Sequence, residues 1–378
     1  MSPLEQQLSS EIAQRGSISF RDFMARALYD PGHGYYGAGK ARVGRGGDFF
    51  TNVSVGPLFG RLLARQFVEM WRRLGEPAEF VLVEQGAHRG DCAADVLTAL
   101  REFDPACFAA TTFWLVEPLA QLRQIQGERL RDFGSEKVRW AEALTDLPPF
   151  RGVHYSNELV DAFPVHRVSW RGDRWMERCV DFQEGRFVFV DAEISSETLR
   201  AHLTSLPPVP TDYETEVNLA VAPWLAEVES RLQAGFILAI DYGYPREEYY
   251  RPERTTGTLS AYAAHQREPD PLLRPGEIDL TAHVDFTTLA ETAAPLGLQL
   301  TGFTDQHHFM VGLSRLHFPD DQALSAASQK ELRAFKTLMH PGLMGRSFHA
   351  ICLAKGTGDP ALTGFQFGGD PRRKLLPA

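Results

Sequence analysis

The chain has 378 residues, 43% of them hydrophobic, so it can bury a large core and does not have the composition of a disordered protein. Its formal net charge of −10 at pH 7 excludes a globally basic surface, which makes nucleic acid a poor candidate partner. The four cysteines lie far apart in the sequence without a Cys-x-x-Cys pair, which argues against a structural zinc site and against a disulfide framework.

The sequence has no obvious membrane or export signal. Residues 1–15 are polar and amphipathic and lack the apolar stretch of a signal peptide. No run of 18 apolar residues occurs elsewhere in the chain. We therefore expect a soluble cytoplasmic protein with no membrane insertion.

The first 75 residues predict two helices separated by a glycine-rich loop. Residues 18–29 have apolar side chains at helical spacing, and Ser19 is placed to cap this helix. Residues 31–52 contain many glycines and few periodic apolar positions, so we expect a long ordered loop, and helical periodicity returns at 55–74. We assign residues 1–75 to an N-terminal helical lid.

Short apolar runs alternate with helical segments from residue 80 onwards. This alternation is typical of a parallel sheet with helices on both faces. It predicts an α/β fold for residues 76–378, with a Rossmann-like seven-stranded core. The strands are expected at 80–84, 113–117, 138–144, 153–159, 236–244, 298–303 and 348–354, and the helices at 91–102, 119–131, 216–232 and 286–296.

Two segments interrupt the alternation. Residues 165–191 alternate apolar and polar positions around two turn signals, which predicts an antiparallel meander. Residues 245–280 are rich in proline and are expected to form a loop. We assign the regions around 165–215 and 245–285 to an inserted α+β region that faces the substrate.

The segment from Val81 to Leu97 contains a candidate binding turn between a strand and a helix. The strand ends on Glu84, and Gly86, Ala87 and Gly90 lie in the turn that follows. Glycines let the backbone turn sharply and approach a ligand closely, while N–H groups at the start of the helix offer polar contacts. The alternative is a purely structural turn, because glycine often serves only to connect a strand to a helix.

Two acidic residues follow the next two strands. Glu117 ends the second strand, where an acid can accept hydrogen bonds from both hydroxyl groups of a ribose. Its alternative role is that of a solvated surface carboxylate, or of a helix N-terminal charge. Glu142 follows the third strand, where a side chain can meet an adenine ring, and the same two interpretations apply to it.

The composition of the turn favours S-adenosylmethionine over a nicotinamide dinucleotide. A pyrophosphate requires a tight glycine triplet with no side chains facing it, and here Ala87, His88 and Arg89 intervene. S-adenosylmethionine has no phosphate, and Glu84 can face its cationic amino-acid end. The sequence therefore favours a methyltransferase, and a nicotinamide-dependent dehydrogenase is kept as an alternative.

Eight blocks of the sequence stand out in order from residue 18 to residue 286: ISFRDFMARALYDPGHGYY, GDFFTNVSVGPLFG, VEQGAHRGD, LVEPLAQLRQIQ, SNELVDAFPVH, AIDYG, GTLSAYAAH and PGEIDLTAHVDF. Together they resemble the MidA family, which includes the mitochondrial protein arginine methyltransferase needed for complex I assembly.

The resemblance implies S-adenosylmethionine as cofactor and a protein side chain, most plausibly arginine, as methyl acceptor. The partner would then be a protein such as a respiratory-complex subunit, and a homodimer is a possible assembly. Asp48, in the second block, joins the candidate cofactor-binding residues.

The chain departs from the family pattern at two positions. His88 stands where the family has the middle glycine of the turn, and Ser54 stands where the family has a glutamate. These changes motivate an alternative function, that of a non-catalytic S-adenosylmethionine-binding assembly or interaction protein with the same fold. The presence of Glu84, Gly86, Gly90 and Glu117 argues for cofactor binding.

Candidate catalytic residues follow the fourth strand of the core, at the position that faces the methyl group in this fold. Asn157 can position an acceptor by hydrogen bonding, and Glu158 can bind a guanidinium group through a two-pronged charge-assisted pair. Asp161 adds a second anion on the same side if a helix starts here. The alternative is that Asn157 and Asp161 only cap the turn before Pro164.

The stretch 276–286 is polar at alternate positions and contains Asp279, His283 and Asp285. These residues do not have a recognisable metal-ligand spacing, so we predict no metal site. Two interpretations stay open. Either Asp285 caps the following helix and His283 is a hydrogen-bonded structural residue, or the stretch forms one wall of the acceptor pocket.

Overall fold

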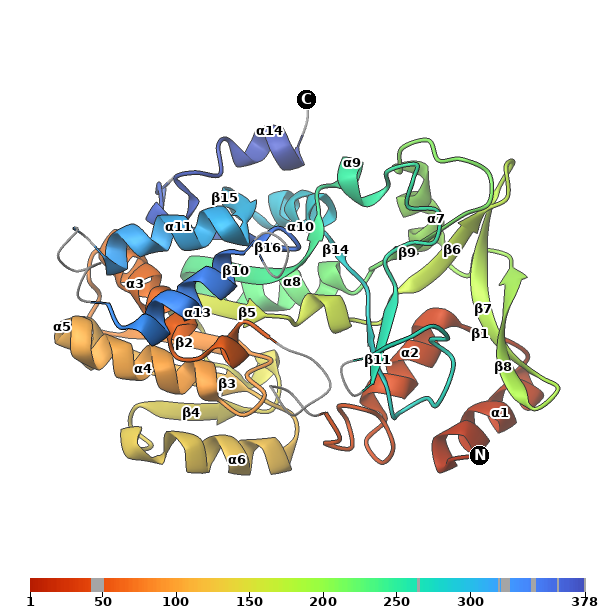
Figure 1. The fold of residues 1–378 in the computed structure, drawn as a ribbon, viewed down its shortest axis with the longest axis horizontal. Coiled ribbons are helices and arrows are strands. Elements are labelled where there is room, and N and C mark those ends of the chain that lie inside the picture. Colours follow the sequence, from red (N-terminus) through yellow and green to blue (C-terminus); the bar gives the residue numbers. More distant parts are fainter. Residues whose placement is uncertain are drawn as a thin grey trace. The chain divides into compact units, whose positions relative to one another are not determined.

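The computed structural model describes residues 1–41, 51–263, 266–318, 320, 327–340, 345–358 and 360–376 (Figure 1). The chain divides into two compact units. Unit 1 consists of Met1–Phe50, Val160–Pro223 and Tyr244–Asp285, and unit 2 consists of Thr51–Leu159, Trp224–Gly243 and Phe286–Ala378. The assignment of residues 1–75 to a lid stays a prediction.

Unit 2 is built around a mixed sheet whose main path has seven strands, in the order β15-β16-β10-β5-β2-β3-β4 (Figure 1). Strands β4, β3, β2, β5 and β10 are parallel, and β16 runs antiparallel to both β10 and β15. This arrangement confirms the predicted Rossmann-like core. The strands are β2 (Phe80–Gln85), β3 (Thr111–Val116), β4 (Val138–Ala141), β5 (Phe150–Asn157), β10 (Leu232–Tyr244), β15 (Gln299–Asp305) and β16 (Phe348–Lys355).

Helices cover both faces of this sheet because its strands are apolar on both sides. Successive residues of a strand point to opposite faces, as His154 and Tyr155 of β5 do. The Tyr155 ring packs against Phe67 of α3, and the His154 ring packs against Trp224 of α8. The helices are α3 (Leu58–Arg73), α4 (Asp91–Phe103), α5 (Pro105–Ala110), α6 (Ala120–Leu130), α8 (Val221–Arg231), α10 (Phe286–Ala293), α11 (Gln306–His317), α13 (Gln329–Met339) and α14 (Pro371–Leu375), with short 3-10 turns η1 (Val53–Val55), η2 (Arg131–Phe133), η3 (Leu144–Asp146), η5 (Ala294–Leu296) and η7 (Thr363–Phe365).

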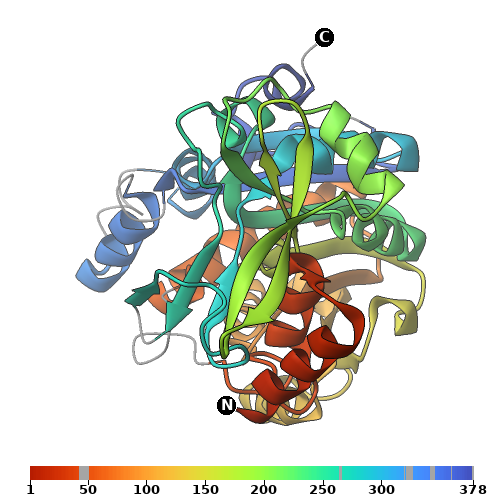
Figure 2. The same ribbon diagram turned by 90° about the vertical axis from the view of Figure 1, so that its right-hand side faces the viewer.

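Unit 1 combines helices with two antiparallel sheets (Figure 2). The predicted meander, residues 165–191, supplies three strands of a five-stranded sheet. Helix α2 packs its apolar face against this sheet, where Phe20 contacts Phe189 and Phe23 contacts Phe187. Ser19 caps α2 as expected, since its hydroxyl accepts the Asp22 N–H at 3.1 Å. The elements are α1 (Pro3–Arg15), β1 (Ile18–Ser19), α2 (Phe20–Tyr29), η4 (Val160–Ala162), β6 (His166–Trp170), β7 (Trp175–Gln183), β8 (Arg186–Ala192), α7 (Glu197–Thr204), β9 (Tyr213–Val217), α9 (Arg246–Tyr249), β11 (Ser260–Ala263), β12 (Gln266–Glu268), β13 (Asp279–Thr281) and β14 (Val284–Asp285).

Two predictions about local structure are wrong. The helix expected at 216–232 begins only at Val221, because Tyr213, Thr215 and Val217 alternate inward as a buried strand, β9. The segment 245–280, expected as a loop, contains α9 and the strands β11 and β12. Prolines near these strands masked their short period-two pattern. Within the described residues, no helix has the length and apolar character needed to cross a bilayer.

Candidate functional site

The ends of three neighbouring strands of unit 2 bring the predicted site residues to one edge of the sheet. Gln85, the last residue of β2, lies opposite Val116 of β3 on one side and Ser156 of β5 on the other. All three strands are parallel, so the residues that follow them leave the sheet at the same level. Glu117 follows β3, Asn157 ends β5, and the glycine turn follows β2.

The turn after β2 relies on backbone conformations that favour glycine. Gly86 and Gly90 have φ angles of 82° and 79°, and Gly90 is the residue from which α4 starts. A Cβ atom at Gly86 would lie 3.2 Å from Leu159 Cδ1, so the backbone passes close to the end of β5. His88 also has a positive φ angle, 45°. Histidine therefore occupies a left-handed position in the turn that the resembling family fills with glycine.

Glu84, the penultimate residue of β2, is a buried carboxyl group with unused acceptor capacity. Its side chain is 4% exposed, and Oε2 has no hydrogen-bond partner among the described residues. Burial raises its pKa to about 8, and the nearby charges of Asp91 and Asp95 act in the same direction, while a hydrogen bond with Cys92 opposes them. A cationic ligand group at this position would supply the donor that Glu84 lacks.

Glu117 is held by one donor on each carboxylate oxygen. Oε1 accepts the backbone N–H of Leu119 at 3.0 Å, and Oε2 accepts Nε2 of Gln126 at 3.3 Å. Burial raises the pKa of Glu117, and these two hydrogen bonds and Arg123 oppose the shift. Each carboxylate oxygen offers about two lone-pair positions, so each retains one for a further donor. The pair of acceptors matches the pair of hydroxyl groups on a ribose.

The other predicted cofactor residues differ in their surroundings. Ala87 is buried within the glycine turn. Glu142 follows β4 with a side chain 70% exposed, and it pairs with Arg123 at 2.8 Å. Arg123 also donates to the backbone carbonyl of Glu117 at 2.9 Å. Asp48 lies outside the described residues.

Asn157 and Glu158 are joined to two residues from distant parts of unit 2. Asn157 accepts Nδ2 of Asn52 at 3.0 Å and donates its own Nδ2 to Glu158 Oε1 at 2.8 Å. Asn52, in turn, accepts Nε2 of Gln306 at 2.8 Å. Asn52 and Gln306 are fully buried. The result is a continuous hydrogen-bonded chain of side chains that includes the Glu158 carboxylate.

Asp241, near the end of β10, stabilises the exit from β5. Its Oδ2 accepts the backbone N–H of Leu159 at 3.1 Å, and its Oδ1 accepts the N–H of Tyr242 at 2.8 Å. The backbone N–H of Glu158 also donates to Ile240 at 3.0 Å. Glu158 has a φ angle of 55°, so the strand ends there and no helix includes this residue.

Comparison with known proteins identifies the family of the chain. Residues 62–304 match a family model, Methyltransf_28, described as "Putative S-adenosyl-L-methionine-dependent methyltransferase". The chain belongs to this family. A crystal structure from Burkholderia thailandensis, of a protein bound to S-adenosyl-homocysteine, is 32% identical, with a TM-score of 0.85 over 96% of this chain and 94% of that one. A native structure of a protein from the same organism has the same identity and coverage and a TM-score of 0.83.

Two relatives from animals have a lower identity to this chain. The Drosophila melanogaster protein named "Protein arginine methyltransferase NDUFAF7 homolog, mitochondrial" is 29% identical over 93% of this chain and 85% of its own length. The mouse protein named "Protein arginine methyltransferase NDUFAF7, mitochondrial" is 28% identical over 93% of this chain and 84% of its own length. The family membership confirms the predicted resemblance, the methyltransferase fold and S-adenosyl-L-methionine as the cofactor. The residues that bind this cofactor stay predictions.

The remaining candidate residues lie in unit 1. Asp161 is a buried residue of η4, and its backbone carbonyl accepts the N–H of Ala282 at 2.9 Å. Asp279, in β13, accepts the Tyr36 hydroxyl at 2.8 Å. Asp285 pairs with Arg246 at 3.4 Å. These contacts fit structural roles, and the predicted catalytic role of Asp161 stays a prediction.

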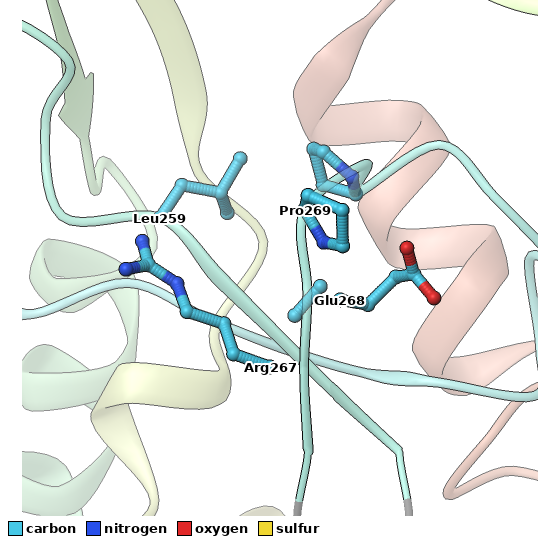
Figure 3. Close-up of a pocket in the computed structure, with 6 residues that line it drawn as sticks. Leu259, Arg267, Glu268 and Pro269 are labelled. Atoms are coloured by element: carbon cyan, nitrogen blue, oxygen red, sulfur yellow. The ribbon is translucent and has the colours of Figure 1, made fainter.

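Unit 1 also contains a hollow that is lined by residues other than the predicted site residues. It is formed by Leu259, Ala261, Arg267, Glu268, Pro269 and Pro271 (Figure 3). Arg267 and Glu268 are neighbours on β12, and Figure 3 shows the two side chains extending in different directions. None of the predicted cofactor or catalytic residues lines this hollow. Among the residues that the structure describes, no group of three or more His, Cys, Asp or Glu side chains is arranged to hold a metal ion.

Sequence reasoning missed Asn52, Gln126 and Gln306. Their signals were weak because an isolated amide side chain is most often exposed, whereas these three are fully buried. Asn52 and Gln126 do lie inside two of the blocks that resemble the family, GDFFTNVSVGPLFG and LVEPLAQLRQIQ.

Proposed function

We propose that this chain transfers a methyl group from S-adenosyl-L-methionine to a protein side chain, and that the acceptor is arginine. The observation that carries the proposal is the Glu158 carboxylate, which follows β5 at the same sheet edge as the glycine turn and Glu117. The names of the relatives support the choice of arginine. The position of Glu158 and the names of the relatives are both needed, because the fold by itself does not specify a methyl acceptor.

The residues at the ends of β2 and β3 fit the cofactor. Glu84 has a buried oxygen without a partner, which suits an ammonium group, and Glu117 has one free acceptor position on each oxygen, which suits a ribose. Gly86 and Gly90 allow the backbone between these acids to approach a ligand. When bound, the cofactor would supply a sulfonium methyl group, which a nucleophile attacks in line with the thioether as the leaving group.

The chain's contribution on the acceptor side is to orient a carboxylate. Asn157 donates to Glu158 Oε1 at 2.8 Å and the backbone N–H of Asn52 donates to the same oxygen at 3.4 Å. A carboxylate fixed in this way can bind a guanidinium group by a two-pronged pair. When the attacking nitrogen forms its bond to the methyl carbon, the methyl–sulfur bond breaks and the nitrogen gives up one proton to solvent. Glu158 is placed to hold the positive charge of the guanidinium group near the reacting nitrogen.

Incubation of the purified chain with methyl-labelled cofactor tests this proposal. Peptides that contain arginine, and matched peptides with lysine at the same position, serve as acceptors, and methylated residues are identified by mass spectrometry. We expect methylarginine with the wild-type chain and at least a 100-fold lower rate with Glu158→Gln. Glu79→Gln, at an exposed position ahead of β2, is the control and keeps the wild-type rate.

The same experiment distinguishes a methyltransferase from a non-catalytic protein that only binds S-adenosyl-L-methionine. Labelled lysine without labelled arginine would show that the acceptor is misassigned. Tight binding of S-adenosyl-homocysteine without any transfer would favour the non-catalytic binding protein, for which the left-handed His88 in the glycine turn is the motivating observation.

A further inference from the structure

Gln126, on α6, connects three parts of the predicted cofactor site, and the proposed function gives it no role. Its Nε2 donates to the backbone carbonyl of His88 at 2.7 Å and to Glu117 Oε2 at 3.3 Å. Its Oε1 accepts Nε1–H of Trp140, on β4, at 2.9 Å. The side chain is fully buried, so it has exchanged its water contacts for these three partners.

The orientation of the Gln126 amide follows from the chemistry of its partners. The indole N–H of Trp140 can only donate, so the atom that faces it must be the amide oxygen. The NH₂ group then faces the His88 carbonyl and the Glu117 carboxylate, which can both accept, and each N–H has one acceptor. Rotating the amide by 180° would place oxygen against oxygen twice and N–H against N–H once. Trp140 therefore fixes which end of Gln126 meets Glu117.

Gln126 also packs against the turn. A Cβ atom at Gly90 would lie 3.4 Å from Gln126 Cγ and 3.6 Å from its Cβ, so the stem of the side chain follows the start of α4 closely. The same residue thus contacts the backbone of the glycine turn at two points and the acid after β3 at a third. Its position couples the turn to the orientation of the Glu117 carboxylate.

We propose that Gln126 is a positioning residue that aims Glu117 at both hydroxyl groups of a ribose, and so makes this site specific for a ribonucleoside cofactor over its 2′-deoxy analogue. This inference rests on the proposed binding of S-adenosyl-L-methionine at the ends of β2 and β3. The Leu119 N–H occupies one acceptor position on Glu117 Oε1, Gln126 occupies one on Oε2, and each oxygen keeps one further position. Without Gln126 the carboxylate can rotate, and the two acceptors no longer match two hydroxyls.

Calorimetric titration with S-adenosyl-homocysteine and with its 2′-deoxyribose analogue tests the proposal. We expect the wild-type chain to bind the ribose form about 30-fold more tightly, in the range for a hydrogen bond to a charged group. In Gln126→Met, which keeps the length and the helix propensity of the side chain, this ratio is expected to fall below about 3-fold. Gln124→Met, at an exposed position of the same helix, should retain the wild-type ratio.

A merely structural role gives a different result. If Gln126 only supported the fold, Gln126→Met would weaken both ligands by the same factor and leave the ratio at its wild-type value, which would overturn the proposal. Trp140→Phe provides a second variant, because it keeps an aromatic ring on β4 and removes only the N–H that orients the amide. We expect its ratio to fall to about 10-fold.

The titrations distinguish a wrong cofactor site from a wrong role of Gln126. Failure of the wild-type chain to bind S-adenosyl-homocysteine would refute the proposed cofactor site and this inference with it. Wild-type binding with an unchanged ribose-to-deoxyribose ratio in both Gln126→Met and Trp140→Phe would refute only the positioning role of Gln126.

Discussion

Two neighbouring regions of unit 2 differ in the hydrogen bonds of their buried polar side chains. At the ends of β2 and β3, the carboxylates of Glu84 and Glu117 are buried and keep unused acceptor positions. At the end of β5, the amides of Gln306, Asn52 and Asn157 are linked to one another, and Gln306 Oε1 lacks a partner among the described residues. Burying a polar group without a partner costs stability, so unused acceptors are expected where a ligand completes them. The contrast suggests a first region built for binding and a second built to hold one orientation.

The largest expected effect is on binding, at the first region. Glu117→Ala removes two hydrogen bonds from a charged acceptor, so the affinity for S-adenosyl-homocysteine should fall by about 100-fold or more. Glu128→Ala is the control, because Glu128 is an exposed carboxylate on α6 and is not one of the predicted cofactor residues. We expect a change of less than about 3-fold in calorimetric titration of that variant. Equal affinities of Glu117→Ala and wild type would remove the ribose assignment.

A substitution in the second region is expected to lower the free energy of unfolding. Asn52→Ala leaves the Asn157 carbonyl oxygen without its buried donor and removes the acceptor of Gln306 Nε2, which should lower the free energy of unfolding by about 2 kcal/mol. Chemical denaturation measures this change, and Gln124→Ala at an exposed helix position should change it by less than about 0.5 kcal/mol. A variant as stable as wild type would show that the amide chain does not hold this region together.

Glu84 gives the first region a pH dependence. The pKa of Glu84 is raised to about 8 in the folded chain, from 4.5 in the unfolded chain. The shift contributes stability to the folded state that is fully present below pH 4.5 and is lost as the pH rises through 8. A ligand ammonium group favours the ionised carboxylate, so affinity for S-adenosyl-homocysteine should increase about fivefold between pH 7 and pH 8 and about tenfold by pH 9, where it levels off. Titration in buffers with different ionisation enthalpies should also show proton release. Glu84→Gln should abolish both effects, and an affinity independent of pH in the wild type would contradict the account.

The smallest expected effects are changes in the free energy of unfolding when either of two glycines near the first region is replaced by alanine. Gly86→Ala should lower the free energy of unfolding by about 1 kcal/mol, because φ is 82° and the new Cβ would lie 3.2 Å from Leu159 Cδ1. Gly127→Ala, within α6, has no neighbour within 4 Å of the new atom and should raise the stability by about 0.5 kcal/mol. Thermal unfolding of the two variants distinguishes a conformational requirement from general sensitivity of the unit. Shifts of the same sign would contradict this explanation.

The sequence predicted the binding region better than the orienting region, and the reason is physical. Glu84, Gly86 and Glu117 are placed by the ends of apolar strands, which a local pattern of hydrophobicity indicates. Asn52 and Gln306 lie 254 positions apart and meet only after folding, so no local pattern predicts their hydrogen bond. The same limit explains β9, where Glu216 was assigned to a helix although it lies in a buried strand.

A crystal structure of the chain with S-adenosyl-homocysteine tests the central claim most directly. The account predicts that the two Glu117 carboxylate oxygens accept the two ribose hydroxyls within about 3.2 Å and that the ligand's ammonium group lies within hydrogen-bond distance of Glu84 Oε2, directly or through one water. A ligand bound elsewhere, or a ribose that does not contact Glu117, would contradict it.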